Sequence, residues 1–423
     1  MDAPPPNRWL MLALGTAAQT SAFVFVYGLP YLIPELRSAE HLTLAQAGAV
    51  VATPTAGLLL ALYAWGAATD RWGERIVLTT GLGLGTVALA ATPAAHGLAL
   101  LSLLFALAGA AGASVSAASG RVVLGWFPPE QRGLAMGLRQ TSTPLSMLVA
   151  AVTMPPLAQA YGLRGALAFA AGLCGLMAVL VALCVVDPPR PPKSPAGGER
   201  PRSPYREARL WRIHGASALM VWPQFTVGAF GLVYLTDVCG WSAVTAGQFM
   251  AVGQAFAAVC RVGAGQWSDR VGSRLRPMRT LAVAVGALCL LLAAFAHVRW
   301  VAVPVLIVLC GLSASTNGLS FTSVAELAGP HWAGRTLAVQ NTGQNLTASL
   351  CPPVVGALIA AAGYGPAFAV AGACALTAIG TLPPRSGRAG GGTTLPRPSA
   401  RDAATAGGAP SAGSPAPGGP TGR

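Results

Sequence analysis

Two arginines lie inside long apolar stretches of the chain and could bind an anion. Arg139 follows Arg132 by seven residues, and Arg261 precedes Asp269 by eight. At about 1.5 Å of rise per residue, each would lie about 10 Å from the polar end of a helix. A charged side chain at that depth in a membrane is costly and marks a candidate functional site, and a guanidinium suits a carboxylate because it can donate two parallel hydrogen bonds. The alternative is that each arginine extends back to the membrane surface.

Uncharged polar side chains in other apolar stretches could line a path for a substrate. In the stretch from 334 to 362 the amides recur at i and i+4, so they form one polar stripe on a helix. The alternative is hydrogen bonding between neighbouring helices. The candidate lining residues are Gln19, Tyr27, Gln140, Gln224, Asn317, Gln340, Asn341, Gln344 and Asn345.

The remaining chemistry-bearing residues predict neither an enzyme nor a cofactor or metal site. None of the 13 acidic residues falls at the middle of an apolar stretch, and the five histidines lie at stretch ends or in loops. The eight cysteines are scattered without a C-x-x-C pair, which argues against a metal or disulfide framework. Neither H-E-x-x-H nor G-x-S-x-G occurs.

Composition places the chain in a membrane. Only 9% of its 423 residues are charged and 53% are hydrophobic, whereas a soluble domain has about 25% charged residues. The apolar stretches are long enough for membrane helices and too long for barrel strands. The net charge of +14 does not indicate nucleic-acid binding, because nearly all basic residues lie between apolar stretches or in the termini.

The sequence predicts an all-α integral membrane protein with twelve membrane-spanning helices in two six-helix bundles. We expect 1–8 to be an N-terminal lead, 9–186 and 213–382 the bundles, 187–212 a basic linker and 383–423 a disordered tail. The predicted helices cover about 9–34, 43–65, 76–92, 98–123, 133–158, 166–186, 213–236, 243–264, 279–296, 300–325, 334–362 and 365–382.

The distribution of basic residues predicts the orientation. With twelve spans, both termini and the linker lie on the same side of the membrane. Only Arg37, Arg164 and Arg299 of the 27 basic residues would fall in loops on the other side. Because basic residues concentrate in cytoplasmic loops, we expect a plasma-membrane protein with cytoplasmic termini and linker.

One ten-residue pattern, G-x-x-x-D-R-x-G-x-R, occurs twice at an offset of 199 residues, between the second and third and between the eighth and ninth spans. Self-similarity on this scale indicates a duplicated architecture. The patterned residues are Gly66, Asp70, Arg71, Gly73 and Arg75 in the first copy, and Gly265, Asp269, Arg270, Gly272 and Arg274 in the second.

These two copies, in matching halves, resemble the signature of the major facilitator superfamily, and the resemblance covers about residues 9–382. It implies a transporter that works by rocker-switch alternating access, with one substrate site between two pseudo-symmetric bundles. In this scheme Asp70 docks on the N-terminus of the eleventh helix and Asp269 on the fifth, where the helix dipole favours a negative charge.

The resemblance also implies roles for the other patterned residues. Gly66 and Gly265 permit close helix approach, and Arg71, Arg75, Arg270 and Arg274 anchor the loops. Arg121, near the end of the fourth helix, is a candidate partner of Asp70. The alternative is that these charges only orient the protein in the bilayer.

The superfamily brings the fifth and eighth helices face to face, which would place Arg139 and Arg261 at one cavity. The segment from Arg261 to Arg270 is similar to the eighth helix of monocarboxylate and oxalate/formate porters, where the family has a substrate-binding arginine. We therefore expect a secondary transporter of a small, monocarboxylate-like organic anion, with protons as a candidate coupling ion. The alternative is an exporter of drugs or natural products. Export of cations is disfavoured because no carboxylate lies at mid-span.

Overall fold

The computed structural model describes residues 7–384 except 43, 96 and 189–202. These residues contain helices and no strands. Most of the predicted linker and the predicted disordered tail lie outside the described residues. A compact unit ends at Pro383, and everything below concerns that unit.

The described residues of the first half of the chain, called here the N half, form seven α-helices. The first begins at Arg8, where the Asn7 side chain caps it by accepting a hydrogen bond from the Trp9 amide at 3.0 Å. The helices are α1 (Arg8–Gly28), α2 (Ile33–Glu40), α3 (Leu44–Trp72), α4 (Glu74–Ala91), α5 (Leu98–Trp126), α6 (Arg132–Arg139) and α7 (Ser142–Cys184).

The second half, called here the C half, repeats the arrangement with seven more helices. Its second helix begins where the Ser242 hydroxyl accepts a hydrogen bond from the Thr245 amide at 3.2 Å. The helices are α8 (Ala208–Asp237), α9 (Ala243–Val271), α10 (Leu275–Ala294), α11 (Arg299–Ser313), α12 (Thr316–Ala328), α13 (Ala333–Ala362) and α14 (Tyr364–Thr381).

The helices of the described residues account for the predicted spans and confirm the predicted fold class. Ten helical stretches are long and apolar enough to cross a membrane. The stretch Pro129–Cys184 holds two spans, because Gly162 has a φ of 67° and breaks α7 where the fifth and sixth predicted spans meet. α9 is not among these apolar stretches, but it is long enough for a span, since its 29 residues extend over about 44 Å, more than a bilayer core of about 30 Å.

Several boundaries differ from the sequence prediction. Both copies of the repeated pattern lie largely within helices: α3 and α9 continue past Asp70 and Asp269 and stop at Gly73 (φ 102°) and Gly272 (φ 61°). A glycine is favoured at both stops because a side chain rarely adopts a positive φ. α8 begins at Ala208, so the last five residues of the predicted linker are helical.

Two predicted spans are broken beside the central cavity described below. The fifth is split between α6 and α7, where Pro144 lacks the amide hydrogen that would pair with the carbonyl of Gln140. The tenth is split between α11 and α12, where the Ser315 hydroxyl donates to the Gly311 carbonyl at 2.7 Å. Such a side-chain bond competes with the helical backbone pattern.

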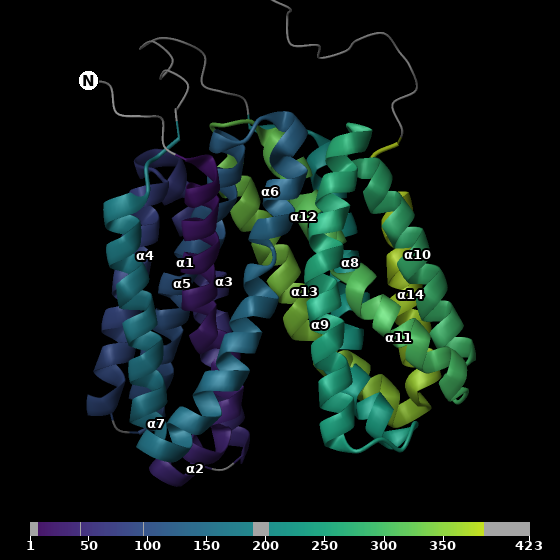
Figure 1. Ribbon diagram of the computed structural model, residues 1–423, viewed down its shortest axis with the longest axis horizontal. Coiled ribbons are helices and arrows are strands. Elements are labelled where there is room, and N and C mark those ends of the chain that lie inside the picture. Colours follow the sequence, from purple (N-terminus) through teal and green to yellow (C-terminus); the bar gives the residue numbers. More distant parts are fainter. Residues whose placement is uncertain (1–6, 43, 96, 189–202, 385–423) are drawn as a thin grey trace, which may run out of the picture. The chain divides into compact units, whose positions relative to one another are not determined.

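The helices of each half pack mainly on one another, and a smaller set joins the halves. The joining pairs include α3 with α13, α6 with α9, α5 with α13 and α6 with α12. We call the end of the bundle at which α7 ends and α8 begins the linker side. In Figure 1, α6 and α12 lie side by side near the upper ends of the long helices. The halves therefore meet through segments at the linker side.

Candidate functional site

Asp70 ties the N half to the C half at the linker side. Its carboxylate accepts the amide hydrogens of Gly334 (2.9 Å) and Arg335 (3.2 Å), the second and third residues of α13. Arg121 on α5 donates to Asp70 at 2.8 Å and pairs with Glu74 at 2.8 Å. The N-terminal amides and the helix dipole both favour a carboxylate at this position. We call this group the Asp70 latch.

Asp269 makes the matching contact from the C half. It accepts the amide hydrogens of Gly133 (2.9 Å) and Leu134 (2.7 Å) at the start of α6. Arg274 pairs with Asp269 and with Glu326 on α12, the latter at 3.0 Å. Burial alone lowers the pKa of Arg274, but its bonds to the two carboxylates raise that pKa overall, so the guanidinium stays charged. We call this group the Asp269 latch.

The two latches distribute charge differently. In the Asp70 latch the arginine belongs to α5 and the second carboxylate, Glu74, to the repeated pattern. In the Asp269 latch the arginine, Arg274, belongs to the pattern and the second carboxylate, Glu326, to α12. In each latch one arginine pairs closely with two carboxylates. A second arginine lies farther from one of them, with Arg335 3.8 Å from Asp70 and Arg132 3.9 Å from Glu326. Neither Glu74 nor Glu326 was among the sequence candidates, because a single glutamate at a helix end gives no distinctive pattern.

Glycines allow the backbones of the two halves to touch beside the latches. A Cβ added at Gly66 would lie 2.7 Å from the Gly334 carbonyl oxygen, and one at Gly265 would collide with the Gly133 carbonyl. A cluster of buried apolar side chains from both halves adjoins these contacts. It includes Leu12, Val123, Phe127, Met136, Leu210, Ile213, Phe321 and Leu337. The linker side is therefore closed by apolar packing as well as by charge.

The other arginines of the repeated pattern lie apart from the latches. Arg75 donates through its amide to Asp187 at 2.7 Å and through its side chain to the Ala182 carbonyl at 2.9 Å, at the end of α7. Arg71 is exposed and lies over the ring of Trp72 at 5.5 Å, and Arg270 is exposed. Arg75 therefore binds the end of α7 in its own half, and Arg71 and Arg270 lie in the last turns of α3 and α9.

A central polar cavity of about 80 Å³ lies between the halves. Such a volume admits several waters. Helices of both halves line it, and all the sequence candidates except Gln340 and the two arginines take part. The lining residues are Gln19, Phe23, Tyr27, Ser116, Gln140, Thr143, Val221, Gln224, Phe225, Asn317, Phe321, Asn341, Gln344, Asn345 and Ala348. The sequence candidates included Tyr27 but missed the other members, because phenylalanine, serine, threonine and small apolar residues are common in membrane helices. The missed residues are Phe23, Ser116, Thr143, Val221, Phe225, Phe321 and Ala348.

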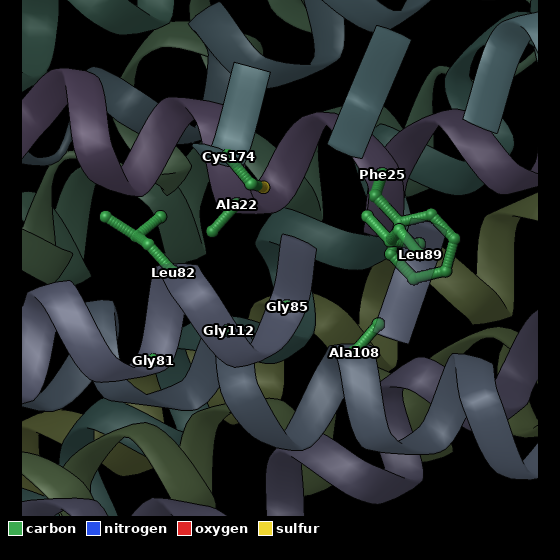
Figure 2. Close-up of a pocket in the computed structure, with 9 residues that line it drawn as sticks. All are labelled: Ala22, Phe25, Gly81, Leu82, Gly85, Leu89, Ala108, Gly112 and Cys174. Atoms are coloured by element: carbon green, nitrogen blue, oxygen red, sulfur yellow. The ribbon is translucent and has the colours of Figure 1, made fainter. Parts of the chain in front are cut away.

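A second, smaller cavity of about 10 Å³ lies inside the N half and is unlike the first (Figure 2). Small and apolar side chains from α1, α4, α5 and α7 surround it, and the Cys174 thiol is bonded to the Ser21 carbonyl at 3.6 Å. Without polar groups aimed into it, this space is a packing gap, not a binding site.

Arg139 is 1% exposed and is held entirely by the protein. It donates to the Ser119 hydroxyl at 2.8 Å, to the Gln140 amide oxygen at 2.9 Å and to the Ser116 carbonyl at 3.0 Å. Its guanidinium also lies over the Phe321 ring of the C half at 5.4 Å. Arg139 therefore stands behind Gln140 and Ser116 and supports the cavity wall from outside.

Arg261 is 4% exposed and lacks such partners. Its Nε and Nη1 atoms are buried and have no hydrogen-bond partner among the described residues. It lies near Tyr27 of the N half, a residue of the cavity wall. The carbonyl of Arg261 packs against Gly137, where an added Cβ would lie 2.7 Å away. The two arginines thus approach the same region from opposite halves, and only one is satisfied by the protein.

The chain matches the profile of the Major Facilitator Superfamily over residues 11–352. It is 40% identical over 386 residues to an uncharacterized MFS-type transporter of Mycobacterium tuberculosis, covering 89% of this chain and 85% of the relative. It is 25% identical over 260 residues to a probable chloroplastic anion transporter of Arabidopsis thaliana, covering 54% of this chain and 49% of that protein.

Solved structures share the fold at lower identity. The human organic anion transporter MFSD10 has a TM-score of 0.70 at 16% identity, over 90% of this chain and all of that one. FucP in an outward conformation has a TM-score of 0.69 at 17% identity, over 88% and 97%. With its family match, its fold and its cavity between two repeated halves, the chain is a multi-pass membrane transporter of the Major Facilitator Superfamily.

Proposed function

We propose that this transporter carries a small organic anion of the monocarboxylate type across the plasma membrane by secondary active transport. The observation that carries the proposal is Arg261. Its Nε and Nη1 atoms are buried without a hydrogen-bond partner among the described residues, and a desolvated cation without a partner is costly. A carboxylate offers the two acceptors that a guanidinium is shaped to bind.

The cavity beside Arg261 suits the rest of such a ligand. Its described lining includes amides and Tyr27 but no carboxylate or second cation, so nothing in the wall competes with a substrate anion for Arg261. Tyr27 lines the cavity and lies near Arg261, so it connects the cavity with this arginine. We infer that the carboxylate binds at Arg261 and Tyr27 while the amides orient its remaining polar groups.

The substrates of related proteins support an anion. The Arabidopsis relative is described as a probable anion transporter, and MFSD10 as an organic anion transporter. These names concern those proteins, and they agree with the chemistry that we infer from Arg261.

The latches suggest how access to the cavity alternates. In this conformation Asp70 and Asp269 each hold the start of a helix in the opposite half at the linker side. We propose that the linker side is cytoplasmic, that the structure is closed toward the cytoplasm, and that transport requires both latches to release while the halves rock about the cavity. The unequal share of basic residues on the two sides supports this orientation.

A second candidate is export of a drug or natural product. The cavity wall includes Phe23, Phe225 and Phe321, and aromatic rings could hold an apolar compound. This candidate leaves the buried charge of Arg261 without a role, so we place it second.

Counterflow measurements test the proposal. Full-length protein would be reconstituted in liposomes and tested for exchange of labelled lactate, pyruvate, oxalate and formate. We expect saturable exchange of at least one of these anions and a loss of at least about 100-fold in Arg261→Gln, because two charge-assisted hydrogen bonds are removed. Arg299→Gln is the matched control, since Arg299 is exposed at the start of α11.

Two results would contradict the proposal. Normal anion exchange in Arg261→Gln would remove Arg261 from the binding site. Absence of exchange with all four anions, together with efflux of an uncharged apolar dye such as Nile red by the wild-type protein, would favour the exporter.

A further inference from the structure

A continuous chain of polar side chains begins at His214 on α8. The Nδ1 atom of His214 is hydrogen-bonded to the Gln340 amide oxygen on α13. The Gln340 amide nitrogen donates to the Ser217 hydroxyl and, at 3.2 Å, to the Ser320 hydroxyl on α12. Gln340 is 2% exposed, which explains why this member of the predicted polar stripe does not reach the cavity.

The chain continues from Ser217 to the cavity wall. The Gln344 amide nitrogen donates to the Ser217 hydroxyl at 2.7 Å and to the Asn317 amide oxygen at 3.4 Å. The Asn317 amide nitrogen in turn donates to the Gln224 amide oxygen at 3.1 Å. Gln344, Asn317 and Gln224 all line the cavity. Side chains of α8, α12 and α13 therefore link the His214 ring to the substrate space.

The bonding pattern leaves one ring nitrogen of His214 available for a proton. Because the Gln340 amide nitrogen donates to two serines, its oxygen is the atom that faces the ring. Nδ1 must then carry a hydrogen, and Nε2 is the basic atom. Nε2 is buried without a hydrogen-bond partner among the described residues, yet the residue as a whole is only half-buried. Imidazole is the side chain that titrates near neutral pH.

We propose that His214 is the proton-binding group of this transporter and that its protonation is linked to anion binding in the central cavity. This inference rests on the proposed function, because the link requires an anionic substrate. A lone imidazolium beside a low-dielectric cavity is unfavourable, and an anion in that cavity makes it less so. By reciprocity, proton binding strengthens anion binding by the same factor.

Within the part of the chain that the structure describes, the groups beside the His214 ring are uncharged. They are the Gln340 amide and the rings of Tyr205, with centroids 6.2 Å apart, and Trp211, at 6.0 Å. Burial, with nearby Tyr63 and Asp70, raises the pKa of Tyr205, so this phenol stays neutral. Charged side chains on the surrounding helices bind other groups. Arg212 donates to carbonyls at the end of α14, and Arg279 donates to the Pro383 carbonyl. Glu326 pairs with Arg274, Arg335 lies over Trp332 and near Asp70, and Arg261 lies near Tyr27.

The position of His214 also brings it near the Asp70 latch. Tyr205, stacked on the His214 ring, contacts the ring of Trp332 at 6.3 Å and lies near Asp70. Trp332 immediately precedes α13, whose first amides bind Asp70. A charge on His214 therefore lies between the substrate cavity and the contact that closes the linker side.

The test compares anion affinity at two pH values. In liposomes of equal internal and external pH, the half-saturating lactate concentration for counterflow would be measured at pH 5.5 and at pH 8, where a carboxylic acid of pKa about 4 is ionised at both. We expect the wild type to bind lactate about tenfold more tightly at pH 5.5, an advantage that disappears as pH rises and His214 loses its proton. His214→Asn keeps a donor near the position of Nδ1 and removes the titrating Nε2, so its affinity should not change with pH.

Controls separate this proposal from the proposed function. His331→Asn, at an exposed histidine before α13, should retain the pH dependence, and His214→Gln provides a second variant if His214→Asn does not fold. A wild-type pH dependence that persists in both His214 variants overturns the role of His214. If the wild type exchanges none of the four anions, the proposed function fails. Proton binding at His214 is then tested separately by a pH titration of tryptophan fluorescence. An inflection from Trp211 that is lost in His214→Asn supports proton binding at His214, and an unchanged titration overturns it.

Discussion

Arg139 and Arg261 are both buried within the membrane-spanning helices and approach the central cavity from opposite halves, but their surroundings differ. Arg139 has oxygen partners on Ser119, Gln140 and Ser116, all from its own half. The Nε and Nη1 atoms of Arg261 have none among the described residues. A buried cation with hydrogen-bond partners is compensated within the fold, whereas one without them carries a free-energy cost that a bound anion would offset.

The difference also revises the prediction of an anion held between two guanidiniums. Arg139 donates hydrogen bonds to Gln140 and Ser116, two residues of the cavity wall, and lies behind them. Arg261 keeps two donor atoms free within the part of the chain that the structure describes. We therefore assign the anion to Arg261 alone and a positioning role to Arg139. The predictions below test this division.

The largest expected effect is on anion affinity. Arg261→Gln should weaken lactate binding by about 100-fold or more, because two charge-assisted bonds contribute about 3 to 6 kcal/mol. Arg139→Gln should weaken it by about tenfold or less, since it acts only through Gln140 and Ser116. The measurement is the lactate concentration that half-maximally raises the thermal unfolding midpoint of the purified protein. Equal losses in the two variants would contradict the division.

Stability without substrate should change in opposite directions. Arg139→Met should lower the free energy of unfolding by about 3 kcal/mol, because it removes three buried hydrogen bonds, to Ser119, Gln140 and Ser116. Arg261→Met should raise it by about 1 kcal/mol, because it removes a buried charge without a protein partner. Thermal unfolding in detergent measures both, with the exposed Arg299→Met as the control. A destabilised Arg261→Met would show that the protein already satisfies this guanidinium.

The two latches extend the comparison to the closed linker side. Asp269→Asn removes the charge that binds two α6 amides and Arg274, and Asp70→Asn removes the matching charge at α13. Each should favour opening of the linker side by about 1 to 2 kcal/mol, or about tenfold in population. Distances between spin labels at Glu130→Cys and Arg270→Cys, both exposed, would report the opening in a background without native cysteines. An unchanged distance distribution in both variants would show that the aspartates do not hold the halves together.

The sequence was informative where a pattern repeats and silent where contacts depend on packing. The spacing of apolar stretches predicted the helices, and the duplicated pattern predicted where Asp70 and Asp269 lie relative to the opposite half. The full set of polar candidates, of which the amide stripe is one part, included most polar members of the cavity wall. No pattern could show that Ser119 satisfies Arg139, or that Gln340 turns away from the cavity toward His214, because these bonds join side chains of different helices and depend on how those helices pack.

The smallest expected effect concerns Arg75 and Arg274, which occupy the same position in the two copies of the repeated pattern. Arg274 joins both carboxylates of its latch, whereas Arg75 binds the carbonyl of Ala182 and, through its amide, Asp187 of its own half. Arg75→Ala should lower the free energy of unfolding by about 1 kcal/mol or less, as for an exposed hydrogen bond, and leave the Glu130–Arg270 label distance unchanged. Arg274→Ala should lengthen that distance. If Arg75→Ala opens the linker side as far as Arg274→Ala does, Arg75 and Arg274 have the same role. The different charge arrangements of the two latches would then have no effect on opening.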